Sequence, residues 1–258
     1  MNLYPPSLSR RAWRVVRRNF LVWRKLLGGS VITHLADPII YFFGIGLGVG
    51  SLIGDVNGVS YLEFMAGGML GYTVMNSASF EGLYSAFTRM HVQKTWESIL
   101  NAPMELDDIV VGEWLWAGIK GLIAGAAMLL VVSVIGLASY PQTILIVPCL
   151  TLAAAAFASM ALAFNAIARS YEFFSVYFTL IIAPMFILSG AFFPVDTMPM
   201  PLQIVSMLLP LSHFIDLARP LLLGEMPPSV LVPLSVLLAY TVIGLWVAAV
   251  LTRRRLVD

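Results

Sequence analysis

The chain has 258 residues, of which 59 % are hydrophobic and only 11 % are charged. Typical soluble domains are roughly 45–50 % apolar and about 25 % charged, so this composition excludes both an ordinary soluble fold and a disordered chain. The single cysteine, Cys149, provides neither a disulfide framework nor a cysteine metal site. Because most of this apolar surface must face lipid, the composition predicts a polytopic membrane protein.

The first predicted element is an amphipathic interfacial helix at residues 8–27. Trp13, Val16, Phe20 and Trp23 recur there at steps of three and four, with arginines between them. Such a helix lies in the headgroup layer, with its aromatic stripe toward lipid and its arginines toward anionic head groups. A nucleic-acid-binding arm is disfavoured because aromatic residues occupy the alternate face.

Six apolar runs follow, each with the roughly 20 residues that a membrane crossing requires. They predict an all-α fold of six transmembrane helices in a single domain, residues 1–258: 31–53, 61–87, 110–138, 143–167, 173–192 and 230–251. Lys and Arg residues number seven before the first run, two between the second and third, one between the fourth and fifth, and three after the sixth. The positive-inside rule then places both termini in the cytoplasm.

A short cytoplasmic helix is predicted at residues 93–103, between the second and third runs. Val92, Trp96, Ile99 and Leu100 recur at helical spacing, and Pro103 ends the pattern. Asp107 and Asp108 precede the next apolar run. Capping of that helix is the favoured role for these carboxylates, and cation binding together with Glu105 is the alternative.

The outer region at 194–228 is rich in proline and predicts two re-entrant or interfacial helices, too short to cross a bilayer. His213, Asp216 and Arg219 recur at steps of three and share one helix face. They could hold a polar substrate head or relay protons, but a local ion-pair network is the favoured interpretation.

Charged residues inside the apolar runs are candidates for function, and they include Glu81, Glu113 and Lys120. Glu113 and Lys120 lie seven residues apart, hence on one helix face, where they can pair directly or through water. The sequence has no catalytic triad spacing, no metal-ligand motif and no GxxxxGK[ST] loop. No catalytic or metal site is therefore predicted, and any ATP-driven work needs a separate subunit.

Several segments together resemble the permease subunits of ABC type-2 exporters, and most of all the NodJ-like branch that exports nodulation factors. The matching segments are QKTWESIL at 93–100, Gly112-Glu113, LSGAFFPV at 188–195 and LPLSHFIDLARP at 209–220. In that family two six-span permeases pair with two cytoplasmic P-loop ATPases that bind ATP and Mg. The resemblance implies a bacterial inner-membrane protein. The partners that it implies are a second copy of the chain, in a homodimer, and membrane lipids rather than nucleic acid.

The resemblance also assigns roles to residues. The 93–103 segment is similar to the coupling helix that docks into the ATPase, which gives the docking role to Thr95, Trp96, Glu97, Leu100 and Pro103. The first and fifth spans resemble those that line the translocation path, which makes candidates of Phe173, Phe174, Tyr177 and Phe178. A plain belt of interfacial aromatic residues is the alternative for these four.

The leading functional hypothesis is an ATP-driven exporter subunit that moves an amphiphilic, lipid-linked or oligosaccharide cargo outward by alternating access. The alternative is a proton- or ion-coupled carrier that uses Glu113, Lys120 or Glu81. An intramembrane enzyme is the weakest hypothesis because the three histidines fall in separate regions. The matching segments do not specify the cargo.

Overall fold

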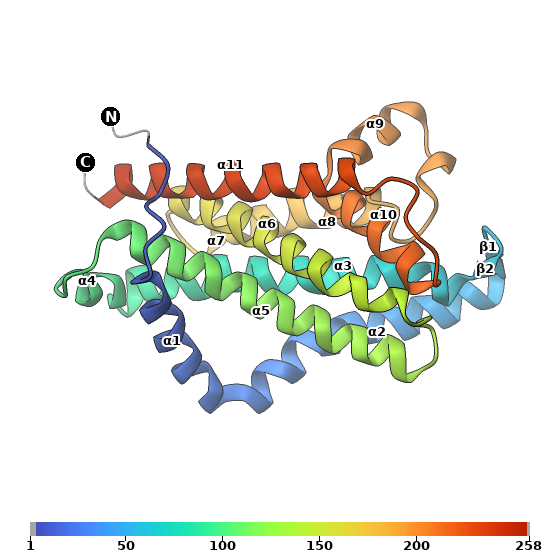
Figure 1. Cartoon of the computed structure of the whole chain (residues 1–258), viewed down its shortest axis with the longest axis horizontal. Coiled ribbons are helices and arrows are strands. Elements are labelled where there is room, and N and C mark those ends of the chain that lie inside the picture. The colour runs from blue at the N-terminus through green and yellow to red at the C-terminus, as the bar shows by residue number, and fades with distance from the viewer. Residues whose placement is uncertain (1–3, 257–258) are drawn as a thin grey trace.

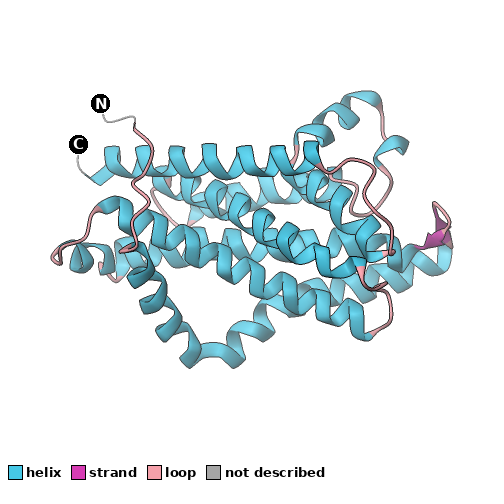
Figure 2. Cartoon of the chain, viewed as in Figure 1, coloured by secondary structure: helices cyan, strands magenta, loops and turns pink. Residues whose placement is uncertain are grey.

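The computed structural model describes residues 4–256, with the side chains of 26–35 and 37 excepted. This part of the chain is a bundle of helices with one two-stranded hairpin (Figure 2). The α-helices are α1 (Ala12–Trp23), α2 (Leu27–Ile53), α3 (Tyr61–Phe80), α4 (Thr95–Leu100), α5 (Leu106–Val134), α6 (Ile146–Ile167), α7 (Glu172–Tyr177), α8 (Ala183–Leu188), α9 (Met200–Leu208), α10 (Pro210–Leu222) and α11 (Leu231–Leu256). Strands β1 (Asp55–Val56) and β2 (Val59–Ser60) pair antiparallel.

Short 3₁₀ and π segments extend or join these helices. The 3₁₀ segments are η1 (Arg24–Leu26), η4 (Gln142–Leu145) and η6 (Val195–Thr197), and the π segments are η2 (Glu81–Ser85), η3 (Thr88–Val92) and η5 (Phe178–Ile182). Through η2 and η3, the helix that begins as α3 continues to Val92, five residues beyond the end of the run predicted at 61–87. Through η5, helices α7 and α8 form one apolar helix, Glu172–Leu188.

The starts of α3 and α5 follow the local capping chemistry. Ser60 and Glu63 form a reciprocal capping box at the start of α3, in which the Ser60 amide donates to Glu63 Oε2 at 2.9 Å. At α5, the Glu105 amide donates to Asp108 Oδ2 at 3.0 Å. This cap starts α5 at Leu106, four residues before the beginning of the predicted run at 110–138. Asp108 therefore has the capping role, whereas Asp107 pairs with Arg253.

Three described helices are long and apolar enough to cross a membrane: Leu106–Val134, Gln142–Ile167 and Leu231–Leu256. Helices α9 and α10 reach this length only together, and they are bent by 86° where Leu209 joins them. The structure therefore supports an all-α membrane protein with three to four candidate spans. Pro38–Ile53 and Glu172–Leu188 are shorter apolar helices.

Helix α3 forms the centre of the bundle. Met65, Met69, Leu70 and Val74 are fully buried within it, and α3 packs against α2, α5, α6 and α10. Glycines allow close approach: a Cβ at Gly68 would stand 2.6 Å from the Ala191 backbone. Small residues at helix contacts are the general means of close packing between membrane helices.

The two ends of the bundle differ (Figure 1). Both termini and α4 lie at one end, whereas the β1–β2 hairpin and α9 lie at the other. Helix α1 crosses α5 at the first end. It buries Ala12, Val15 and Asn19 there, and leaves Trp13 and Phe20 exposed. Phe20 and Trp23 of the aromatic stripe also meet Trp116 of α5, with ring centres 6.4 and 5.8 Å apart, so part of the stripe packs against protein.

Candidate functional site: a buried ionic network beside the short helix α4

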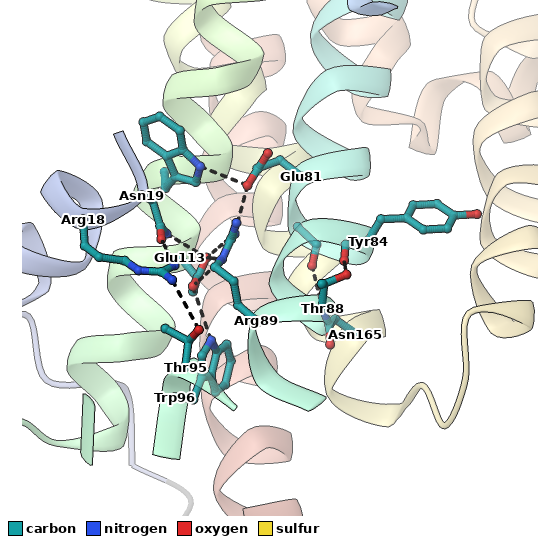
Figure 3. A network of polar contacts seen from close by, with 12 residues as sticks. Arg18, Asn19, Glu81, Tyr84, Thr88, Arg89, Thr95, Trp96, Glu113 and Asn165 are labelled. Atoms are coloured by element: carbon teal, nitrogen blue, oxygen red, sulfur yellow. Dashed lines mark hydrogen bonds and ion pairs between the residues drawn. The ribbon is translucent and has the colours of Figure 1, made fainter. Parts of the chain in front are cut away.

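A cluster of ionic and polar side chains, which includes Glu81, Arg89 and Glu113, connects several helices (Figure 3). Its centre is Arg89 on η3, which pairs with two carboxylates. Arg89 Nε and Nη2 donate to Glu113 Oε1 and Oε2 at 2.9 and 2.5 Å, and Nη2 stands 2.9 Å from Glu81 Oε1. We call Arg89, Glu81, Glu113, Asn19 and Trp96 the Arg89 network.

The two carboxylates of the network accept further hydrogen bonds from three helices. Glu113 accepts from Asn19 Nδ2 of α1 at 3.2 Å and from Trp96 Nε1 of α4 at 3.3 Å. Glu81 accepts from Trp116 Nε1 of α5 at 2.9 Å. Glu113 is thus a common acceptor for α1, α4 and the end of the α3 helix.

The electrostatics of the network favour its charged form. Burial of the guanidinium acts to lower the pKa of Arg89, but the adjacent Glu113 and Glu81 outweigh burial, so this pKa stands above its ordinary value. A charge-assisted bidentate pair of this geometry fixes the relative orientation of the two side chains and the register of the two helices that carry them. Arg89 therefore stays protonated and positions the helices around it.

Two π segments, η2 and η3, flank the network on the α3 helix. The wider turns leave backbone carbonyls without their usual α-helical donors, and Asn165 of α6 supplies one. Its Nδ2 donates to the carbonyls of Gly82 and Leu83 at 2.7 and 3.1 Å. Single π turns inside helices frequently mark functional sites. Hydrophobic periodicity carries no signal for π turns, so they were not predicted.

Helix α4 is attached to the network through Trp96. The Trp96 side chain is buried and faces the bundle, whereas Glu97, Leu100 and Pro103 are exposed. Thr95 lies between these environments and accepts a hydrogen bond from Arg18 Nη2 of α1 at 3.3 Å. Of the five residues given a docking role, Trp96 therefore contacts the bundle, and three others form an outward surface.

The intramembrane charges have distinct environments. The ion pair that the structure shows for Glu113 is with Arg89, not with the neighbour seven residues along its own helix. Lys120 is buried and its Nζ lies 4.9 Å from the centre of the Trp23 ring, a cation–π contact. Lys120, which the sequence suggested as a direct or water-mediated partner of Glu113, thus contacts α1 through the Trp23 ring, and Glu113 pairs with Arg89 of another helix.

The four aromatic candidates for a translocation path do not form one wall. Phe174 and Tyr177 are buried in the core, Phe178 is half-buried and Phe173 is exposed. Another aromatic group, Tyr84 with Tyr171, stacks at 6.1 Å near the Arg89 network. Sequence reasoning missed this pair because its members lie on separate helices.

The outer polar residues have mainly backbone partners. Arg219 donates from Nε to the Phe64 carbonyl at 3.0 Å and from Nη2 to the Gly190 carbonyl at 2.5 Å. His213 Nε2 lies 2.9 Å from the Met207 carbonyl, and Asp216 is exposed. No ion pair within 4 Å joins His213, Asp216 and Arg219, all of which the structure describes, so the expected ion-pair network does not form. Nowhere in residues 4–256 do three described His, Cys, Asp or Glu side chains gather as a metal site requires.

The family model for the ABC-2 type transporter matches residues 10–223 of this chain. The chain belongs to the ABC-2 type transporter family. It is 41 % identical over 257 residues to Nodulation protein J of Rhizobium meliloti (strain 1021), which covers 98 % of each chain. It is 43 % identical over 245 residues to Nodulation protein J of Rhizobium leguminosarum bv. viciae, with 95 % of each chain covered.

A more distant relative is the inner membrane transport permease YadH of Escherichia coli (strain K12). It is 27 % identical over 221 residues, which cover 84 % of this chain and 82 % of the relative. The chain is accordingly an ABC-2 type transport permease with membrane-spanning helices. Membership in this family implies an ATPase partner.

Proposed function

We propose that this chain is the permease subunit of an ATP-driven exporter, and that α4 is its coupling helix. The observation that carries the proposal is the attachment of α4 to the bundle. Trp96 binds Glu113 of α5, and Glu113 binds Arg89 at the end of the α3 helix. Glu97, Leu100 and Pro103 remain exposed on the same short segment. A partner that pushes on this surface would move α3 and α5 through buried, charge-assisted contacts.

The proposed assembly contains two copies of the chain, each with six spans and cytoplasmic termini, and two cytoplasmic ATPase subunits that bind ATP and Mg. The arrangement at the end of the bundle supports this orientation, because α4, both termini and the arginine-rich α1 lie together there (Figure 1). The positive-inside rule assigns such an end to the cytoplasm. Closure of the ATPases would then open an outward path between the two permeases by alternating access.

The proposed cargo is an amphiphilic, lipid-linked or oligosaccharide molecule. The support comes from the relatives named Nodulation protein J, which match nearly the whole chain. Phe173 and the half-buried Phe178 are the described aromatic candidates that such a cargo could reach. An aromatic surface suits the apolar part of an amphiphile or a sugar face.

The test is purification of the tagged full-length protein from its own membranes in mild detergent, followed by mass spectrometry and an ATPase assay. We expect a P-loop ATPase in roughly equimolar amount. Glu97→Arg should remove the ATPase, and Glu225→Arg should retain it, because Glu225 is an exposed acidic residue outside the α4 surface. A preparation without any ATPase, under conditions that keep a known ABC complex intact, would refute the proposal. ATP-independent transport driven by an ion gradient would instead support a carrier that uses Glu81, Glu113 or Lys120.

A further inference from the structure

A cavity of about 370 Å³ lies beside the Arg89 network, between α1, the end of the α3 helix and α5. Its lining includes Arg18, Trp23, Glu81, Tyr84, Trp116 and Tyr171. This volume is within the roughly 300–1,000 Å³ range of small-molecule sites. It would accommodate a head group and the first methylenes of a chain, but not a whole lipid.

The cations that line the cavity are not equally neutralised. Arg89 is held between two carboxylates. Arg18, by contrast, donates only to neutral acceptors: Nη1 to Asn19 Oδ1 at 3.0 Å and Nη2 to Thr95 Oγ1 at 3.3 Å. No carboxylate among the described residues stands within 4 Å of it. Arg18 is therefore a half-buried guanidinium without a direct counter-charge.

The environment of Arg18 disfavours its charge. Burial, followed by the positive charge of Arg89, lowers the pKa of Arg18, and Glu113 only partly opposes this effect. A half-buried cation without a direct counter-charge costs free energy that an anion at hydrogen-bonding distance recovers. The side chain thus offers an anion a planar donor that needs no rearrangement of the Arg89 pair.

Aromatic rings form a further part of the cavity wall. Trp23 and Trp116 meet edge to face at 5.8 Å, and Tyr84 stacks with Tyr171 at 6.1 Å. Indole and phenol rings favour the boundary between head groups and acyl chains. A cationic group beside such rings matches a molecule with an anionic head and an apolar chain.

We propose that this cavity binds the anionic head group of an amphiphile, with Arg18 as its counter-charge. A phosphate monoester on an acyl-chain carrier has the required chemistry. The head group would replace Asn19 Oδ1 and Thr95 Oγ1 as the acceptor of the hydrogen bonds from the Arg18 guanidinium. One of them is Thr95, the first residue of α4, so occupancy of the cavity changes a contact of the proposed coupling helix. This last step rests on the proposed function.

Native mass spectrometry of the purified full-length protein in a neutral detergent tests the site without any ATPase. The probes are dioleoyl phosphatidic acid, dioleoyl phosphatidylcholine and inorganic phosphate. We expect one phosphatidic acid retained per chain, with no comparable retention of phosphatidylcholine and no displacement by inorganic phosphate. Equal retention of the two lipids, or displacement by free phosphate, would overturn the proposal.

Variants of α1 separate the cavity from general surface charge. Arg18→Gln should weaken phosphatidic acid binding about tenfold, as expected for the loss of one charge-assisted hydrogen bond. Arg17→Gln is the matched control, because Arg17 is the exposed neighbour outside the cavity lining, and it should bind as the unchanged protein does. Arg18→Lys keeps the charge and should retain most of the binding. Equal losses of phosphatidic acid binding in Arg17→Gln and Arg18→Gln would show that the lipid binds only to the charged surface and not in the cavity.

The coupling step is tested in the assembled complex, where phosphatidic acid should stimulate ATP hydrolysis in the unchanged protein but not in Arg18→Gln. The two proposals fail differently. Specific lipid retention by a chain that has no ATPase partner would leave the cavity site standing and refute the exporter. A functional ATPase complex whose Arg18→Gln form retains lipid normally would leave the exporter standing and refute the cavity site.

Discussion

Arg89 and Glu113 lie 24 positions apart on different helices, and their side chains meet through two parallel hydrogen bonds, Nε to Oε1 at 2.9 Å and Nη2 to Oε2 at 2.5 Å. Glu113 also accepts from Trp96, so this pair links α4 to the bundle. The pair is nearly inaccessible to solvent, with 11 % of the Arg89 side chain and 1 % of the Glu113 side chain exposed. Its loss should affect both stability and coupling.

Arg89→Met should destabilise the protein by about 3–5 kcal/mol, because it removes the guanidinium that forms ion pairs with two buried carboxylates. Thermal unfolding in detergent measures the effect. Lys94→Met is the control, since Lys94 forms an exposed pair with Glu97, and such pairs contribute about 1 kcal/mol or less. A similarly small loss of stability in Arg89→Met and Lys94→Met would contradict the structural role of Arg89.

Trp96→Phe should keep α4 packed but remove the indole donor to Glu113. A hydrogen bond to a charged group is worth about 1.5–3 kcal/mol, so unfolding should occur at lower temperature. Combined with Glu113→Ala in a double-mutant cycle, the two losses of stability should be less than additive, because each change removes the hydrogen bond between the indole and the carboxylate. Strict additivity would show that Trp96 and Glu113 act independently.

Gly112→Ala should displace α1 from α5. A Cβ at Gly112 would stand 2.6 Å from the Val15 Cβ and 2.8 Å from the Ala12 carbonyl oxygen, closer than real Cβ contacts allow. Gly118→Ala on the same helix meets nothing nearer than 3.9 Å and should be neutral or stabilising by up to about 1 kcal/mol. Limited proteolysis at the α1–α2 connection should accelerate in the first variant alone.

Arg219→Lys should loosen the other end of the bundle. The guanidinium bridges the Phe64 and Gly190 carbonyls and lies 3.8 Å from the centre of the Phe64 ring. An ammonium group cannot reproduce this planar fork. We expect a lower unfolding temperature and faster hydrogen exchange around Gly190, with the exchange of α4 unchanged. Unchanged exchange at Gly190 would show that the bridge is dispensable.

His91 should make stability depend on pH. Burial, followed by the positive charge of Arg255, lowers the pKa of His91 below its usual value. The unfolded chain therefore binds the proton more readily, so this contribution to stability is present above about pH 6.5 and is lost as the pH falls below it. His91→Phe, which preserves the ring contact with Phe87, should reduce the slope of unfolding temperature against pH between about pH 7 and 5. An unchanged slope would assign the dependence to other groups.

The sequence predicted several residues of the site but not the contacts between them. Glu81, Glu113 and Trp96 stand out because charges in apolar runs and aromatic residues at helical spacing are visible in one dimension. The Arg89 network is not visible, because its members come from α1, the end of the α3 helix, α4 and α5. Similarly, Arg219 was assigned to a side-chain network, whereas the structure gives it two backbone carbonyls.

By itself the sequence determined that this is a membrane protein and that its apolar runs are helical, since these properties depend on composition, hydrophobic length and local capping. It also determined the concentration of arginine near the termini. Only the tertiary structure decided which side chains meet. The pairing of Arg89 with Glu113, the inward direction of Trp96 and the cavity beside Arg18 depend on how helices pack and on two π turns. Helical periodicity fixes neighbours at three and four residues, but contacts between helices depend on packing register, which no local pattern encodes.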